Sequence, residues 1–230
     1  MKFNALSIAA AALVLALPAG QAFAIADGPI ADAKPVAPVA PDAAMSARLA
    51  YNLAYEDFDK ARADEAASVA LTGAKRKAAD AKVMEAFARA RTGFEEAAKS
   101  DPNMKEAWNH IGYTNRRLGQ YEASLSAYEK ALALNPHYTE AIEYRGEAYL
   151  ALNRIDDAKA AYMALFSESR AQASVLMQSM QTWVAERRRQ PAGVAATDID
   201  GFASWIDERA AVAQQTASLD TDKTVVRRWN

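Results

Sequence analysis

The 230-residue chain contains no cysteine. This absence excludes disulfide bonds, thiolate metal sites and a cysteine nucleophile, so the fold must be stabilised by packing alone. Histidine is almost as rare, because His110 and His137 are the only two, and two histidines without several carboxylates do not make a zinc site. A glycine-rich phosphate loop and a G-x-S-x-G elbow are also absent. We therefore expect no metal, no cofactor and no enzyme activity.

The chain also lacks an excess of positive charge. Its 27 lysines and arginines are balanced by 29 aspartates and glutamates, for a formal net charge of -2. Nucleic-acid-binding surfaces are basic, so this balance gives no reason to expect a nucleic-acid partner. Glycine is scarce and alanine abundant, which favours helices. No alternation of apolar and polar residues is long enough for a sheet, so we expect a nearly all-α protein.

The first 24 residues have the features of a secretory signal peptide. A short positive start, Met1-Lys2, precedes an apolar run from Ala5 to Leu17, and Ala22-Phe23-Ala24 supplies the small residues of a cleavage site. The apolar run is too short for a membrane-spanning helix, which takes about 20 residues. We expect an exported bacterial protein, cleaved after Ala24 and periplasmic or secreted, with no membrane span afterwards. The alternative is a signal peptide retained as an anchor.

The proline distribution divides the rest of the chain. Four of the eight prolines fall between residues 25 and 45, which predicts an extended Ala/Pro-rich leader there. Ser46 is then a plausible N-cap for a helix that buries Leu49, Leu53, Ala54 and Phe58. The predicted segments are a signal peptide (1–24), the leader (25–45), N-terminal helices with a degenerate repeat (46–88), a repeat core (89–171), C-terminal capping helices (172–219) and a frayed tail (220–230).

A period of 34 residues runs through the middle of the chain. It relates Pro102 to Pro136, Gly112 to Gly146, Ala97 to Ala131, and Phe94 to Tyr128 and Tyr162. The best copy runs from Lys105 to Tyr138, and the next from about Thr139 to Ala171. Before them, a second helix with Ala90 and Phe94 matches the pattern, whereas the first helix expected around Ala74 to Met84 does not.

This period, with a small–aromatic–small helix in each copy, resembles the tetratricopeptide repeat (TPR) family. The resemblance implies stacked helical hairpins, since one hairpin does not cover its own apolar face. The expected fold class is all-α, a short TPR α-solenoid with two clear repeats plus one degenerate repeat, and flanking capping helices. Arg170 stands where the family has proline, so we expect the array to pass there into capping helices.

Two helices are expected after the repeats. The first has Leu176, Met180, Trp183 and Val184 on one face, which predicts a helix that closes the last hairpin. The second begins at Thr197 or Asp198, with Phe202 and Ile206 inward.

The resemblance also implies a binding groove, because the first helices of successive repeats line a surface that receives a peptide or a helix in this family. Six residues are expected on that surface: Asn109, Tyr113 and Arg116 on one helix, and Glu140, Glu143 and Glu147 on the next. The spacing of the glutamates puts three carboxylates on one stripe, which we expect to be exposed. The stripe is either a solvated helix face or a site that attracts a basic segment. Arg116 is expected to act separately, on an acidic or carbonyl group.

These observations predict a scaffold of the bacterial cell envelope that binds a protein or peptide partner. Homo-oligomerisation stays open. One alternative is a self-assembling structural repeat protein, in which the groove or terminal helices meet another copy. Another is a small periplasmic enzyme or carbohydrate-binding protein with a site in the C-terminal third, which would require a deep pocket with convergent polar groups near Trp183 and Trp205.

Overall fold

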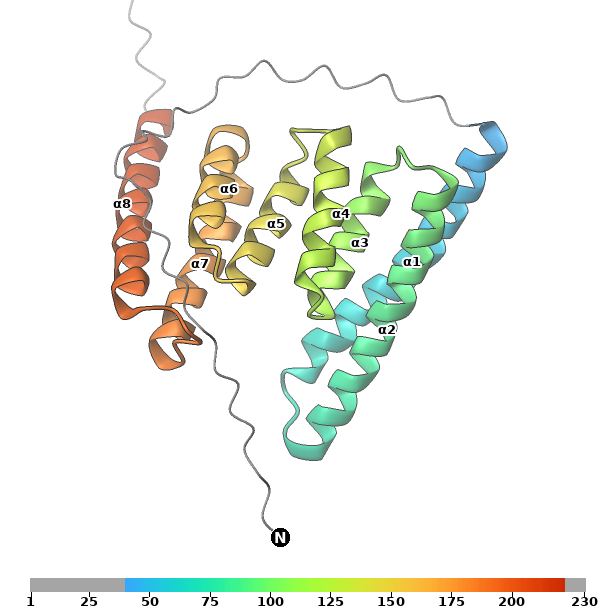
Figure 1. The fold of residues 1–230 in the computed structure, drawn as a ribbon, viewed down its shortest axis with the longest axis horizontal. Coiled ribbons are helices and arrows are strands. Elements are labelled where there is room, and N and C mark those ends of the chain that lie inside the picture. Colours follow the sequence, from blue (N-terminus) through green and yellow to red (C-terminus); the bar gives the residue numbers. More distant parts are fainter. Residues whose placement is uncertain (1–39, 222–230) are drawn as a thin grey trace, which may run out of the picture. The chain divides into compact units, whose positions relative to one another are not determined.

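The computed structural model describes residues 40–221, with side chains through residue 216. The predicted signal peptide, residues 25–39 of the predicted leader and residues 222–230 lie outside this range. Within it the chain forms α helices and no strand (Figure 1). The helices are α1 (Pro41–Ser68), α2 (Gly73–Ser100), α3 (Lys105–Arg117), α4 (Tyr121–Leu134), α5 (Thr139–Ala151), α6 (Ile155–Glu168), α7 (Arg170–Arg189) and α8 (Ala196–Thr221). The all-α fold predicted from the sequence is confirmed.

The first hairpin, α1 and α2, has 28 residues in each helix and is longer than the repeats that follow. The prediction of two short helices between residues 74 and 100 is wrong, because α2 is continuous. No proline lies between those residues, and the turn comes earlier, at Gly73, which has a φ of 57°. A positive φ strains most residues but not glycine, so the chain reverses there.

The start of α1 also differs from the prediction. The helix begins at Pro41, where proline at the first turn leaves no backbone donor unpaired. Ser46 therefore lies inside the helix, where its hydroxyl donates to the carbonyl of Asp42. Ala54 and Phe58 are buried as expected, but Leu49 and Leu53 are exposed on the opposite face.

The two clear repeats are the hairpins α3–α4 and α5–α6. Tyr128 and Tyr162, which share the aromatic position of the pattern, are both buried. Gly112 of α3 lies against the Tyr128 ring, and a Cβ atom at that position would be 2.4 Å from the ring carbon Cε1. The turn after α3 uses Gly119 with a φ of 75°, and the turn after α5 uses Asn153, 34 positions later, with a φ of 58°. Both residue types tolerate this left-handed conformation.

Gly112→Ala is expected to lower the free energy of unfolding by about 1–3 kcal/mol, because the new methyl group forces apart a packed helix pair. Gly201→Ala in α8 is the matched control. No atom lies within 4 Å of a Cβ added there, so the higher helix propensity of alanine stabilises the helix by up to about 1 kcal/mol. Urea denaturation measures both. Shifts of the two midpoints in the same direction contradict this account of Gly112.

The C-terminal helices close the array as predicted. Leu176, Met180, Trp183 and Val184 of α7 are buried, and so are Phe202 and Ile206 of α8. The Trp183 indole N–H donates to the Leu150 carbonyl at 2.7 Å, which fixes α7 against α5. Helix α8 begins at Ala196, just before the predicted Thr197 or Asp198.

Buried apolar side chains of the described residues gather in three clusters along the chain. The N-terminal cluster joins α1, α2, α3 and Ala127 of α4 around Phe58, Phe87 and Phe94. The middle cluster joins α4 and α5 around Tyr128. The C-terminal cluster joins α5 to α8 around Tyr162 and Phe202. Each hairpin is therefore covered by its neighbours, as in a repeat array.

Candidate functional site

The six predicted groove residues lie on α3 and α5, and the structure brings these two helices together. The Tyr113 ring of α3 meets the Tyr144 ring of α5 at 5.0 Å between centroids. The Asn109 amide donates to the Tyr138 hydroxyl at 3.5 Å, just before α5 begins. Helix α7 packs on α5 in turn. The three helices α3, α5 and α7 thus form one row, which we call the α3–α5–α7 face.

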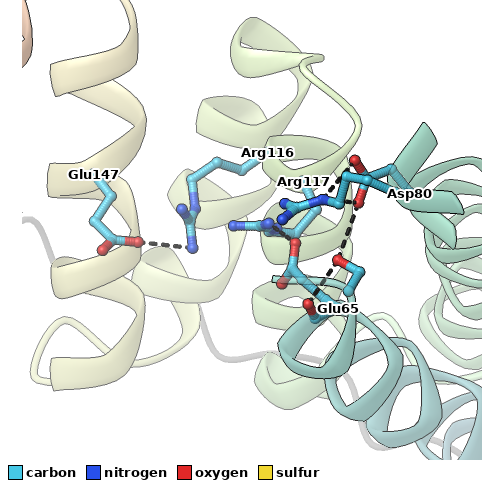
Figure 2. A network of polar contacts seen from close by, with 7 residues as sticks. Glu65, Asp80, Arg116, Arg117 and Glu147 are labelled. Carbon is cyan, nitrogen blue, oxygen red and sulfur yellow. Dashed lines mark hydrogen bonds and ion pairs between the residues drawn. The ribbon is translucent and has the colours of Figure 1, made fainter. Parts of the chain in front are cut away.

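The centre of this face is an ion pair between Arg116 of α3 and Glu147 of α5, 2.7 Å apart (Figure 2). Both side chains are largely buried, with exposed fractions of 13% and 21%. The Arg116 guanidinium also lies over the rings of Tyr113 and Tyr144, at 5.0 and 5.7 Å from their centroids. The prediction that Arg116 acts separately from the glutamates is therefore wrong.

Glu143 departs most from the prediction of an exposed carboxylate stripe. Its side chain is buried, with 4% of the residue exposed. Burial and, to a smaller extent, the nearby Glu147 raise the pKa of Glu143 to about 8, against the opposing effect of Arg116. Most Glu143 side chains are therefore protonated at pH 7. The helical spacing correctly placed the glutamates on one helix face, but that face is covered by neighbouring helices.

The remaining member of the stripe, Glu140, is half-buried. With Glu143 largely neutral and Glu147 paired to Arg116, the stripe does not present three free negative charges. The structural basis for attracting a basic segment is therefore lost, although the six residues do share one face.

Polar contacts extend the Arg116–Glu147 pair in both directions. On one side, the Ser179 hydroxyl of α7 donates to Glu147 Oε1 at 2.7 Å. On the other, Arg117 of α3 pairs with Glu65 of α1 (Figure 2). Nearby, the Arg76 side chain and the Ser68 hydroxyl both donate to Asp80. These contacts connect α1, α3, α5 and α7 through charged groups.

A polar cavity of about 650 Å³ opens on the α3–α5–α7 face. Its lining side chains come mainly from α3, α5 and α7 and include three arginines and two glutamates. The charged ones are Arg116, Arg117, Glu147, Glu186 and Arg187, and the polar ones include Gln178, Ser179 and Thr182. Of this lining, only Arg116 and Glu147 are among the six predicted groove residues. Helix α7 is predicted only as a cap, but it packs on α5 and continues the row of first helices.

Of the two tryptophans named for an alternative C-terminal site, Trp183 is buried in the core and Trp205 is half-buried against it. Trp183 and Trp205 both contact Phe202, at 5.5 and 6.1 Å between ring centroids. A cavity of about 440 Å³ lies nearby, lined mainly by apolar side chains such as Phe166 and Met177, with Arg170 as its charged residue. This lining lacks the convergent polar groups that the enzyme or carbohydrate-binding alternative requires. Trp183 also lines the polar cavity of about 650 Å³, so that alternative stays a prediction.

None of the helices between residues 40 and 221 is both long and apolar enough to cross a membrane. Nor does that range hold a group of three or more histidines, aspartates or glutamates placed to bind a metal ion.

Comparison with known proteins identifies the repeat. Residues 106–138 match the sequence model of the family described as Tetratricopeptide repeat, so the chain contains a tetratricopeptide repeat at its best copy. No curated protein matches the chain in sequence.

Two solved structures share a loose likeness with the chain. The first TPR of Spaghetti (RPAP3), bound to the HSP90 peptide SRMEEVD, is 18% identical, with a TM-score of 0.46 over 60% of this chain and 94% of that chain. The TPR2B domain of yeast Sti1, in its complex with pHsp70, is 12% identical, with a TM-score of 0.36 over 73% of this chain and 98% of that chain. The fold assignment rests on the helices and on the repeat itself.

Proposed function

We propose that this chain, which contains a tetratricopeptide repeat, is a protein-interaction scaffold whose α3–α5–α7 face holds a segment of a partner protein. The observation that carries the proposal is the cavity of about 650 Å³ on that face. Its volume is in the range of ligand pockets, and its wall combines charged groups with hydroxyl and amide groups. An extended peptide or a helix places several side chains along such a row of helices.

The charges of the cavity define the partner's chemistry. Arg116 is matched by Glu147, and Arg117 by Glu65. Arg187 donates through Nε to the Asn153 amide oxygen, and within the described residues no carboxylate pairs with it. A carboxylate of the partner would pair with the Arg187 guanidinium through charge-assisted hydrogen bonds. The proposed ligand is therefore a polar segment with at least one acidic residue. Asn109, Tyr113, Glu140 and Glu143 lie on the two helices that carry the wall and support it.

Two equally exposed residues provide the test. Val175 lines the cavity and Met163 does not, and each is 44% exposed. Peptides are selected from a display library on wild-type protein, and their dissociation constants are measured by fluorescence polarisation. Val175→Arg is expected to weaken binding about tenfold or more, which is ~1.4 kcal/mol, by placing a long side chain over the cavity. Met163→Arg is expected to leave binding unchanged.

Arg187→Gln should weaken the binding of acidic peptides in particular, and raised salt should have the same effect on wild type. Failure to enrich any peptide, or equal binding to Val175→Arg and Met163→Arg, contradicts the proposed site. Thermal melts of each variant verify that the fold is intact.

The proposed place of action is the bacterial cell envelope, with the protein periplasmic or secreted. The support is the composition of residues 1–24, namely a positive start, a short apolar run and small residues at a cleavage position. N-terminal sequencing of protein from the periplasmic fraction is expected to begin at Ile25. Recovery of intact Met1 on cytosolic protein contradicts export.

A further inference from the structure

The cavity of about 440 Å³ lies among α6, α7 and α8, and we call it the C-terminal cavity. Ala173 and Met177 of α7 belong to its wall. Val175 and Ser179, which line the polar cavity on the α3–α5–α7 face, lie on the opposite side of α7, because residues on one side of a helix recur every three or four positions. The two cavities are therefore separate sites.

The wall of the C-terminal cavity is mainly apolar. Two rings come from α6, and small or flexible side chains come from α7 and α8: Tyr162, Phe166, Ala173, Met177, Ala210 and Ala213. The three alanines provide the volume, since larger residues at these positions would fill it. A volume of this size is in the range of small-molecule sites, and apolar cavities in proteins take up apolar molecules.

Two arginines lie beside this apolar wall. Arg170 lines the cavity and is exposed, and its guanidinium lies over the Phe166 ring at 3.4 Å from the centroid. Arg209 precedes Ala213 by one helical turn, which places it on the side of α8 that faces the cavity. The Arg209 Nε atom is buried without a hydrogen-bond partner. Among the residues that the structure describes, neither arginine forms an ion pair.

Tyr162 lies within electrostatic reach of both arginines. Burial raises the pKa of Tyr162, and Arg170 and Arg209 act in the opposite direction. The Thr216 hydroxyl, also in the wall, already donates to carbonyls of its own helix. The polar groups left beside the cavity are thus mainly donors, because guanidinium groups only donate and a tyrosine hydroxyl can donate. A carboxylate, which only accepts, complements them.

Helix stability does not explain the positive charge at position 170. Arg170 is the first residue of α7, and the helix dipole disfavours a cation at this end. An anion beside Arg170 would be favoured both by the guanidinium and by the dipole.

We propose that the C-terminal cavity binds a small amphipathic carboxylate, such as a fatty acid of medium chain length. Its chain lies among the apolar side chains of α6, α7 and α8, and its carboxylate pairs with Arg170 at the mouth. This ligand uses both parts of the site, whereas a sugar would place its hydroxyl groups against an apolar wall. The site is separate from the proposed partner-binding face, so the two proposals fail independently of each other.

The test is isothermal titration calorimetry of the mature chain with octanoate and with octanol, which has the same chain without the charge. Wild type is expected to bind octanoate at one site. Arg170→Gln is expected to weaken octanoate binding about tenfold, by removing a charge-assisted hydrogen bond, and to leave octanol binding unchanged. Arg189→Gln, an exposed arginine on the same helix, is the control that changes neither.

A pair of alanines on α8 tests the position of the chain. Ala213→Leu fills the cavity and is expected to abolish the binding of both ligands, whereas Ala211→Leu, on the exposed side of α8, leaves it unchanged. Val175→Arg, which obstructs the partner-binding face, also leaves octanoate binding unchanged. Thermal melts verify that each variant folds.

Three results would overturn the proposal. Wild type that binds no octanoate overturns the site, whether residues 222–230 or another protein fill the cavity. Equal binding to Ala213→Leu and Ala211→Leu places the ligand elsewhere. Equal weakening of octanoate and octanol by Arg170→Gln means that this arginine does not pair with the carboxylate.

Discussion

Arg116→Ala is expected to lower the free energy of unfolding by about 3–5 kcal/mol, the range for removing one partner of a buried ion pair. The loss leaves the Glu147 carboxylate, 21% exposed, without its cation. It also removes a guanidinium that lies over the rings of Tyr113 and Tyr144. Urea denaturation of wild type and variant measures the change. Arg116→Ala combined with Glu147→Gln should recover part of the loss, because the uncompensated charge is then gone.

The matched control is Arg188→Ala. Arg188 and Asp200 are 2.9 Å apart, nearly the distance of the buried pair, but their side chains are 56% and 69% exposed. Exposed pairs contribute roughly 0–1 kcal/mol because water and salt screen them. Equal losses from Arg116→Ala and Arg188→Ala would show that burial of the Arg116–Glu147 pair has no energetic consequence.

Glu143→Gln is expected to stabilise the protein at pH 8, on the order of 4 kcal/mol. The pKa of Glu143 is raised to about 8 from an ordinary value of 4.5. Between these values the folded state holds a proton that the unfolded state has released, so stability is full below about pH 4.5 and falls as the pH rises toward 8. The slope is at most about 1.4 kcal/mol per pH unit. Glutamine keeps the shape of the neutral acid and removes this dependence.

The measurement is the difference in unfolding free energy between wild type and Glu143→Gln from pH 5 to pH 8. The difference is needed because burial lowers the pKa of His110, so that its contribution to stability rises with pH in the same window. Glu140→Gln is the control. It also removes a carboxylate from α5, but at a half-buried position, so it separates the effect of burying Glu143 from the effect of removing a charge. A pH-independent difference would mean that Glu143 titrates normally.

The sequence was sufficient to predict the repeat and its core. The 34-residue spacing identified the buried Tyr128 and Tyr162, and helical periodicity identified the buried face of α7. Periodicity did not decide which side of α1 is buried. Large apolar residues suggested the side of Leu49 and Leu53, whereas the structure buries the side with small residues, which allow α2 to approach closely. Gly93 of α2, for example, lies against Ala54, with only 2.7 Å from an added Cβ atom to the Ala54 Cβ.

The groove was predicted in position but not in electrostatics. Helical spacing put Glu140, Glu143 and Glu147 on one face, yet spacing within one helix carries no information on which neighbouring helix covers that face. The side chains that contact the Glu147 carboxylate come from elsewhere in the chain. Arg116 lies 31 positions before Glu147, and Ser179 lies 32 positions after it. Trp108 of α3 shows the same limit, because it lies in the best copy of the repeat but is only half-buried, with Lys130 over its ring at 4.0 Å.

The division of the core into three clusters bears on how the protein unfolds. Phe94 belongs to the N-terminal cluster and Phe202 to the C-terminal cluster. Energetic coupling between these two clusters passes through α4 and α5. In such a one-dimensional array the cooperative unit is a group of adjacent hairpins, so the two ends need not melt together. The long α1–α2 hairpin then sets the denaturant midpoint of the N-terminal end of the array. Trp183 fluorescence reports only on unfolding of the C-terminal end.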